Sequence, residues 1–326
     1  MTDLLIYLGF AAVGAFWGST ARKKGKSMAF TGPVQTVAIT CLVIVMGLRM
    51  GSNEEVIDNL GSIGLYAFIF TIISLALVVA GIWGSRKIVK IDKFGRMETA
   101  DLEETAQKNS ENAGEKPKIN KMTIFIVAGV AFGMALGYFI IRPAFENNYE
   151  VFNDAAGLAI NIGLCVLLLF VGVDIGMEGT IVENFKKVGA RVFVFPVVTI
   201  IMSLLTGVIC ALFMPFSVKE GLAIAAGFGW YSLAPGIIME AGLVTVSAIS
   251  FMHNVMRELF SILLIPTIAR KVGYVETTGM PGAAAMDVCL PIVERATSAD
   301  VAVYSFISGV ILSFLVPIMV PIMLAL

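Results

Sequence analysis

The sequence predicts an all-α integral membrane protein with about eight transmembrane helices, and three observations support this fold class. The chain of 326 residues is 58% hydrophobic and only 14% charged, whereas soluble domains carry about 25% charged residues. At least seven apolar runs are long enough to cross a hydrocarbon core about 30 Å thick. Two later segments are interrupted by Pro-Gly and are too long for one crossing each, which predicts two re-entrant hairpins in addition to the spans.

The charges that flank the apolar runs predict the orientation. The first run, residues 4–18, has no basic segment before it and no small-residue cleavage site after it, so we interpret it as a retained span and not a signal peptide. Lys and Arg gather after this run, in 86–121, in 186–191 and at 270–271, whereas the loops 52–60 and 143–154 are acidic or neutral. Basic loops stay in the cytoplasm. We therefore expect a multi-pass protein with its amino terminus outside.

One hydrophilic stretch divides the chain. Residues 86–121 are rich in Lys, Glu, Asn and Gln and poor in apolar residues, which indicates a flexible cytoplasmic linker. Residues 1–85 before it are expected to form a first unit of three spans. Residues 122–214 are expected to form a second such unit, and residues 215–326 a transport core of two units, each made of a hairpin and a span.

The two three-span units contain an internal repeat. Residues 46–75 align with residues 171–200 at a constant offset of 125 without a gap. The aligned pairs are Gly47 with Gly172, Gly51 with Gly176, Asn59 with Asn184, Gly64 with Gly189, Phe68 with Phe193 and Phe70 with Phe195. The first copy leaves the membrane outward and the second inward, so the units have opposite topology. Inverted repeats are typical of secondary transporters, although apolar helices can also resemble each other by chance.

The two Pro-Gly breaks predict where the transport site lies. Pro235-Gly236 and Pro281-Gly282 are each followed within two helical turns by Met and an acidic residue. We expect one hairpin at about 219–246 to enter from outside and the other at about 277–294 to enter from inside, so that the breaks meet near mid-membrane. Non-helical backbone at that depth occurs where it is buried in protein or lines a watery cavity.

Two carboxylates follow the breaks and are the strongest candidates for a site. Glu240 and Asp287 have no basic neighbour at helical spacing, and an unpaired carboxylate in a span costs on the order of 3 kcal/mol. Their counter-ion is therefore expected to be a proton or a cationic substrate. The alternative is a structural role for one of them at the amino terminus of a half-helix.

The span 247–268 carries further polar candidates. Ser247, Ser250, Asn254, Glu258 and Ser261 form one stripe, which we expect to face a cavity. Arg257 lies at the edge of this stripe, where it is predicted either to neutralise Asp174, Glu258 or another buried acid or to bind a substrate carboxylate. The single histidine, His253, receives no role.

The run Trp230-Tyr231-Ser232 lies directly before the first break, where aromatic rings can hold a cation, so we expect it to form the wall of the site. An interfacial aromatic anchor is the alternative. Asp174 is a second-tier candidate, because it closes its span at the cytoplasmic end where water reaches it.

Several motifs resemble the lysine exporter family of bacterial inner-membrane proteins. They are Gly-Phe-Gly-Trp-Tyr-Ser-Leu at 227–233, the acid at Glu240, Arg257-Glu258 followed by Leu-Ile-Pro at 264–266, and Met-Asp-x-x-Leu-Pro at 286–291. The resemblance is strongest from about residue 163 onward. It implies an eight-span exporter of L-lysine and close analogues in the bacterial inner membrane, with an acidic pair at Glu240 and Asp287. The second hairpin departs from the family, since it reads Pro-Gly-Ala-Ala-Ala.

These observations together predict a secondary transporter that exports L-lysine in exchange for protons, with Na⁺ left open as the coupling ion. A monovalent cation/proton antiporter, or a transporter of another small amine or amino acid, is the alternative. We expect no metal, cofactor, nucleic-acid partner or enzymatic activity. An intramembrane aspartyl protease would need two aspartates, and Asp174 with Asp287 lie in no protease-like motif. The bilayer is an expected partner, and a homodimer stays open.

Overall fold

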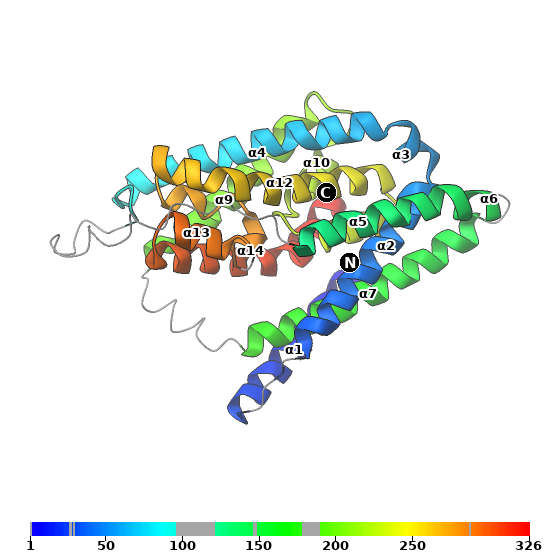
Figure 1. Cartoon of the computed structure of the whole chain (residues 1–326), viewed down its shortest axis with the longest axis horizontal. Helices are drawn as coiled ribbons and strands as arrows, with labels where there is room; N and C mark the ends of the chain where they lie inside the picture. The colour runs from blue at the N-terminus through cyan, green and yellow to red at the C-terminus, as the bar shows by residue number, and fades with distance from the viewer. Residues whose placement is uncertain are drawn as a thin grey trace.

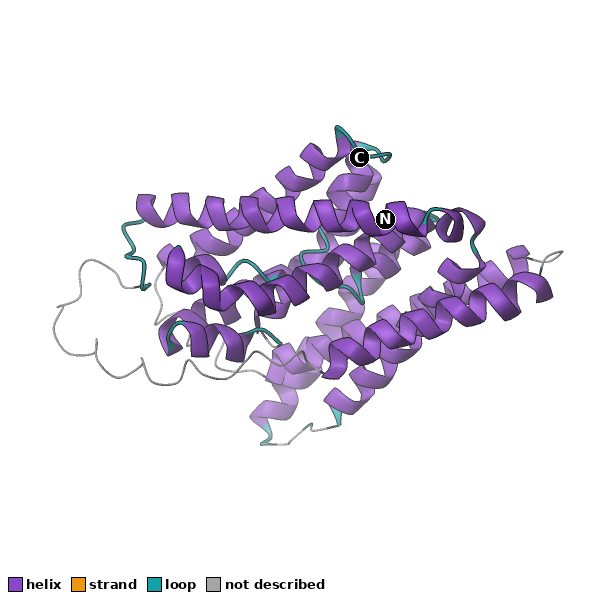
Figure 2. Cartoon of the chain, turned by 45° about the horizontal axis from the view of Figure 1, so that its top comes forward, coloured by secondary structure: helices purple, strands orange, loops and turns teal. Residues whose placement is uncertain are grey.

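The computed structural model describes residues 2–25, 28, 30–95, 121–145, 149–177, 190–286 and 288–326, and within these ranges the chain is helical with short connections and no strand (Figures 1 and 2). The long helices are α1 (Thr2–Lys23), α2 (Thr31–Ser52), α4 (Leu60–Ile88), α5 (Lys121–Leu136), α7 (Tyr149–Met177), α9 (Val194–Ala211), α12 (Val244–Lys271) and α14 (Ala299–Ala325). The short ones are α3 (Glu54–Asp58), the π-helical turn η1 (Gly137–Ile141), α6 (Arg142–Ala144), η2 (Ala190–Phe193), α10 (Val218–Ala225), α11 (Ala234–Glu240), η3 (Val275–Thr277), η4 (Gly282–Met286) and α13 (Leu290–Ala296).

The long helices confirm the predicted membrane fold. In the described part of the chain, seven helical segments are long and apolar enough to cross a bilayer. Their apolar side chains face outward over much of their surface, as expected of helices solvated by lipid. Helix α1, with 22 residues, is the remaining long helix and packs along α7. Counting α1, the described helices agree with about eight spans.

Helices α1, α2, α5 and α7 pack through glycines that let the backbones touch. At each of eight glycines, a carbonyl oxygen of the facing helix occupies the place where a Cβ would lie. Gly14, Gly18, Gly172 and Gly176 make the α1–α7 contact, and Gly47, Gly51, Gly133 and Gly137 make the α2–α5 contact, which continues into η1. Close approach of this kind drives helix association in lipid, where apolar side chains gain nothing from leaving water.

The two broken segments lie in the other half of the bundle, among α4, α9, α12 and α14 (Figure 1). The first consists of α10 and α11. Ser217 and Glu220 form a capping box that begins α10, the chain turns at residues 226–233, and Pro235 begins α11. The second segment consists of η3, η4 and α13, and it packs mainly on α14.

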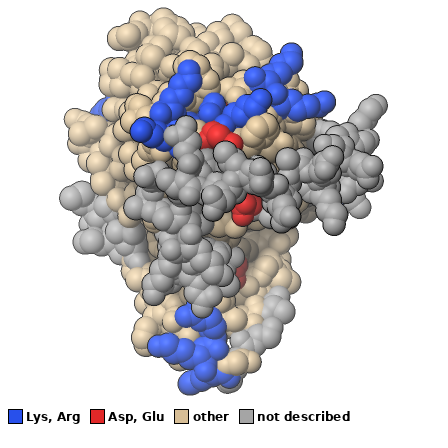
Figure 3. All heavy atoms as spheres, turned by 90° about the vertical axis from the view of Figure 1, so that its left-hand side faces the viewer, with Lys and Arg blue, Asp and Glu red and all other residues tan. Residues whose placement is uncertain are grey.

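Basic residues collect at one end of the bundle, which we call the basic end, and we call the opposite end the far end. The helices α1, α4, α12 and α13 each finish there with Lys or Arg in the last turn: Arg22, Lys23, Arg86, Lys87, Arg270, Lys271 and Arg295. Figure 3 shows this end face on, with the basic side chains gathered at its upper and lower parts.

The first part of the predicted linker is attached to the bundle. Helix α4 continues to Ile88, and the segment after it reaches the second broken segment and α14. Tyr274 N donates to Lys93 O at 2.8 Å, and the Tyr304 hydroxyl donates to Gly95 O at 3.2 Å. Residues 96–120 of the predicted linker lie outside the described residues.

Candidate functional site

The two broken segments touch each other where their helices are interrupted. Ala283 N donates a hydrogen bond to Phe228 O at 2.7 Å. Gly229 has φ +94° and Gly282 has φ +67°, a region that strongly favours glycine, and a Cβ on Gly282 would overlap the Phe228 carbonyl oxygen. The contact therefore joins Pro281-Gly282 of the second segment to Phe228-Gly229 of the first. We call it the tip contact.

Pro235-Gly236 lies away from the tip contact. This pair begins α11, and Gly236 faces Leu164 and Ile160 of α7. The sequence placed the first interruption at this proline. The structure places the turn seven residues earlier, at Phe228, because proline fits the first turn of a new helix while the chain reversal needs positive φ.

The polar stripe of α12 supports the first broken segment, and the prediction that it faces a cavity is wrong. Asn254 Oδ1 accepts from Gly229 N at 2.7 Å, and Ser247 Oγ donates to Pro235 O at 2.7 Å. Asn254 is itself held by Ser250, whose carbonyl oxygen accepts from Nδ2 at 2.8 Å. Backbone groups freed by a break need partners inside a membrane, and these side chains provide them.

Arg257 holds the second broken segment in the same way. It is fully buried, and it donates from Nε to Met280 O at 2.9 Å, from Nη2 to Gly279 O at 3.1 Å and from Nη1 to Ser203 Oγ at 3.3 Å. The sequence left open an ion pair or a substrate carboxylate for Arg257. In this structure Arg257 holds the backbone directly before Pro281, and its predicted roles in an ion pair or in substrate binding stay predictions.

Asp174 is not part of this group. Its side chain is exposed, and Oδ2 accepts from Gln35 Nε2 of α2 at 2.6 Å. The predicted pairing of Asp174 with Arg257 is therefore wrong, because α7 ends at the basic end whereas Arg257 is buried among the broken segments. Glu258, next to Arg257, is 1% exposed.

Glu240 lies at the far end and has a counter-ion within the chain. Arg49 Nη1, in the last turn of α2, lies 3.0 Å from Glu240 Oε1, the last residue of α11. Arg49 Nε also donates to Asn153 Oδ1 of α7 at 2.9 Å. The arginine side chain is 6% exposed and the glutamate side chain 21%. The expectation that Glu240 has no basic partner is wrong, because its partner lies 191 positions earlier and not at helical spacing.

Arg49 and Asn153 are the functional candidates that the sequence reading missed. Arg49 is the only charged residue within α2, which spans 22 residues. A single charge in an apolar span marks a functional candidate, so Arg49 could have been predicted. Asn153 gave no signal, since it lies in the polar first turns of α7.

The aromatic run follows the tip contact directly. Trp230 Nε1 donates to Ser232 Oγ at 3.0 Å, and Ser232 is buried. Trp230 and Tyr231 are half-buried and pack against the hydrophobic core. The rings are thus fixed beside the turn, as the wall of a site would require.

Asp287 lies outside the described residues, so its predicted pairing with Glu240 stays a prediction. The residues just before it are anchored on α14. Ser305 Oγ donates to Ala285 O at 3.0 Å, and Ser313 Oγ lies 3.7 Å from Met286 Sδ. His253, to which the sequence gave no role, is buried with Nδ1 2.9 Å from Thr71 Oγ1 and its ring on Phe70.

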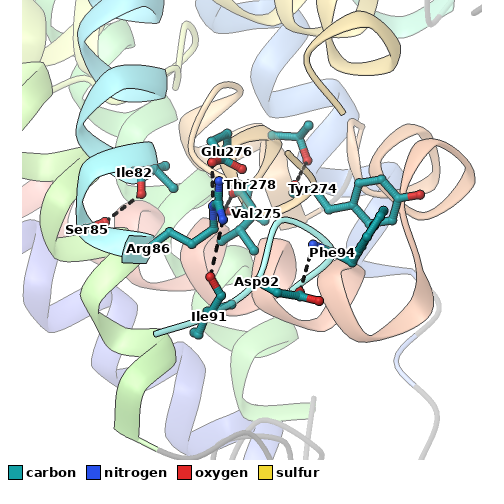
Figure 4. Close-up of polar contacts among 11 residues, drawn as sticks. Ile82, Ser85, Arg86, Ile91, Asp92, Phe94, Tyr274, Val275, Glu276 and Thr278 are labelled. Atoms are coloured by element: carbon teal, nitrogen blue, oxygen red, sulfur yellow. Dashed lines mark hydrogen bonds and ion pairs between the residues drawn. The ribbon is translucent and has the colours of Figure 1, made fainter. Parts of the chain in front are cut away.

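A second buried ion pair lies at the basic end. Figure 4 shows Arg86 of α4 directed toward Glu276 of η3, with Nε 2.7 Å from Oε1. Glu276 is fully buried. Each broken segment is therefore tied to a long helix by an arginine–glutamate pair, the first at the far end through Arg49 and the second at the basic end through Arg86.

Comparison with known proteins gives one consistent result. The model of the family described as lysine exporter LysO matches residues 125–324. The chain is 30% identical to "Lysine exporter LysO" of Escherichia coli K12 over 200 residues, which are 61% of this chain and 62% of that protein. It is 27% identical to "Putative lysine exporter" of Haemophilus influenzae over 195 residues, or 60% of this chain and 94% of that protein. The chain thus spans less than two thirds of the Escherichia coli protein. The region matched by the family model includes Glu240 and Arg257 but neither Arg49 nor Arg86.

Proposed function

This chain belongs to the lysine exporter LysO family, and from that premise we propose that it exports L-lysine and similar cationic amino acids across the bacterial inner membrane. The observation that carries the proposal is the environment of Glu240. Its carboxylate is partly exposed, it lies where α2, α7 and α11 converge, and it already holds a cationic side chain, that of Arg49. A lysine ammonium is chemically close to that guanidinium and can compete for the same oxygens.

We further propose that the basic end faces the cytoplasm and that the amino terminus is outside. The support is the positive-inside rule, applied to the arginines and lysines that finish α1, α4, α12 and α13. With this orientation the Glu240–Arg49 pair lies at the outer side and the Glu276–Arg86 pair at the inner side.

The two ion pairs suggest how the site is exposed first to one side of the membrane and then to the other. In this proposal, each pair closes its own side by tying one broken segment to a long helix. Opening the inner side requires the Arg86–Glu276 contact to separate, and opening the outer side requires the Arg49–Glu240 contact to separate. Both contacts are formed in this structure, at 3.0 Å and 2.7 Å, and in this proposal an occluded state is the state that has both.

The scaffold proposed for this motion is an inverted repeat. Gly47 and Gly51 lie near the far end of α2, and their aligned partners Gly172 and Gly176 lie near the basic end of α7. Each pair packs on the first helix of the other unit, α5 or α1, so equivalent contacts occur at opposite ends of the bundle. Two half-structures of opposite sense can exchange conformations, which supports alternating access.

Proton exchange is the proposed driving reaction. When lysine leaves the outward-open site, a proton from the more acidic side binds to the carboxylate that held it. The site then returns to the inward-open state with this carboxylate neutral. Asp287 is the proposed second carboxylate, and Na⁺ is the alternative coupling ion.

Counterflow in proteoliposomes tests the proposed substrate. Vesicles loaded with unlabelled lysine should accumulate labelled lysine, and external arginine should reduce this accumulation more strongly than leucine, because only arginine carries a side-chain cation. Protein-free vesicles are the control. Equal inhibition by leucine, or no counterflow with correctly folded protein that instead moves K⁺ or Na⁺, would argue for one of the alternative transporters.

A further inference from the structure

An apolar groove runs between α4 and α12 on the membrane-facing surface. Its volume is about 450 Å³, and its lining includes Ile72, Ala76 and Trp83 of α4, Leu264 and Ile268 of α12, and Met280 of the second broken segment. The groove is open because alanines occur on α4 between larger side chains, and Ile72, Trp83 and Leu264 are well exposed along it.

The length of this groove and its position along α4 match one leaflet of a bilayer. Ile72 and Trp83 are eleven residues apart on α4, which is about 16 Å along a helix. Half of a hydrocarbon core is about 15 Å. Trp83 lies toward the basic end, five residues before the last residue of α4, Ile88, and tryptophan is the residue that lies at the edge of a bilayer. The groove therefore extends from mid-membrane to the edge of the leaflet at the basic end.

A basic pocket lies at the same edge. It has a volume of about 240 Å³, and its lining includes Lys93, Arg270, Lys271 and Tyr274. Val272 lines both the groove and the pocket, so the two are adjacent. Lys87 Nζ lies 3.4 Å from the centre of the Trp83 ring, which adds a further cation at the mouth of the groove.

The acidic groups near the pocket have partners of their own. Asp92 Oδ1 accepts from Phe94 N at 2.9 Å, and Glu276 is paired with Arg86. Basic pockets between membrane helices on the cytoplasmic side are typical sites for anionic lipid headgroups.

We propose that the groove and the basic pocket together bind one anionic phospholipid, with an acyl chain in the groove and the phosphate on Lys93, Arg270 and Lys271. This lipid would contact α4, α12 and Met280, whose carbonyl oxygen accepts from Arg257. It would therefore stabilise the second broken segment next to the Arg86–Glu276 pair. This lipid site would exist whichever solute the protein carries.

Thermal unfolding in detergent tests this site with lipids that differ only in the headgroup. Phosphatidylglycerol should raise Tm by at least about 3 °C over phosphatidylcholine with the same acyl chains. The double variant Lys93→Ala/Lys271→Ala should lose this difference, since it removes two headgroup contacts. Ala80→Phe should lose it too, because Ala80 is an exposed residue of the groove lining where a ring would fill the space. Lys24→Ala, on the α1 side of the basic end, is the matched control and should keep it.

Four results would overturn the proposal. If both lipids shift Tm equally, the groove is an unspecific apolar surface. If glycerol phosphate alone shifts Tm as much as phosphatidylglycerol does, the pocket is a site for a free anion. Persistence of the phosphatidylglycerol shift in both groove and pocket variants would place the lipid elsewhere. Disulfide-linked dimers formed by Ala80→Cys in proteoliposomes would show that a second copy covers the groove. Without added lipid, the Tm of each variant should lie within about one degree of that of the parent, because all four substituted positions (Lys24, Ala80, Lys93 and Lys271) are exposed.

Discussion

Glu240→Gln should reduce lysine export on the order of a hundredfold in a reconstituted efflux assay. The amide keeps the shape of the side chain but cannot carry the charge that holds an ammonium, and a hydrogen bond to a charged group contributes about 2–3 kcal/mol. Glu54→Gln is the matched control, because Glu54 also pairs with an arginine, Arg142, but its side chain is 73% exposed. That variant should export lysine at the parent rate.

A double-mutant cycle separates substrate binding by Glu240 from its structural role. Removal of the carboxylate leaves the nearly buried Arg49 unpaired, and this alone can cost about 3–5 kcal/mol of stability. Arg49→Gln/Glu240→Gln removes both charges and should recover Tm while export stays lost. If the double variant instead exports lysine at the parent rate, Glu240 serves only the ion pair and the proposed substrate contact is wrong.

Gly282→Ala should have the second large effect, on stability and on transport together. The added Cβ would overlap Phe228 O, and alanine at φ +67° is strained by about 1–2 kcal/mol even without the overlap. The two segments must then separate, which breaks the Ala283–Phe228 hydrogen bond and disturbs the carbonyls that Arg257 holds. We expect Tm to fall by several degrees and lysine counterflow to be lost.

Gly84→Ala is the matched control for that variant. Gly84 lies inside α4 with no atom within 4 Å of the position of its Cβ, so alanine there should leave Tm unchanged or raise it. Scanning fluorimetry in detergent measures both variants. A Gly282→Ala protein with the parent Tm and parent counterflow would mean that the tip contact does not exist as described.

The spans and the broken segments could be predicted from the sequence, because their signals are local. A run of apolar residues specifies a membrane helix through its own length, and Pro-Gly with a nearby acid marks an interrupted one. The positions of α10, α11 and the η3–α13 segment agree with the predicted hairpins at about 219–246 and 277–294. Their re-entrant placement in the bilayer stays a prediction.

The partners of the buried charges could not be predicted in the same way. Helical spacing compares a residue only with those three or four positions away, whereas Arg49 meets Glu240 and Arg86 meets Glu276 from distant helices. Arg257 is a harder case, since its partners include backbone carbonyl oxygens at Gly279 and Met280, and every residue type has such an oxygen. The polar stripe of α12 was recognised, but its task of pairing freed backbone groups became visible only with the fold.

The dependence of lysine efflux on an imposed pH gradient tests the central claim most directly. Proteoliposomes loaded with labelled lysine, with the membrane potential held at zero, are diluted into buffer that is either more acidic than the lumen or at the same pH. A proton-coupled exporter should give faster lysine efflux into the acidic buffer, and Glu240→Gln vesicles should show no such acceleration. Lysine efflux that is equal at both external pH values, or that accelerates in the Glu240→Gln protein as it does in the parent, would contradict this claim.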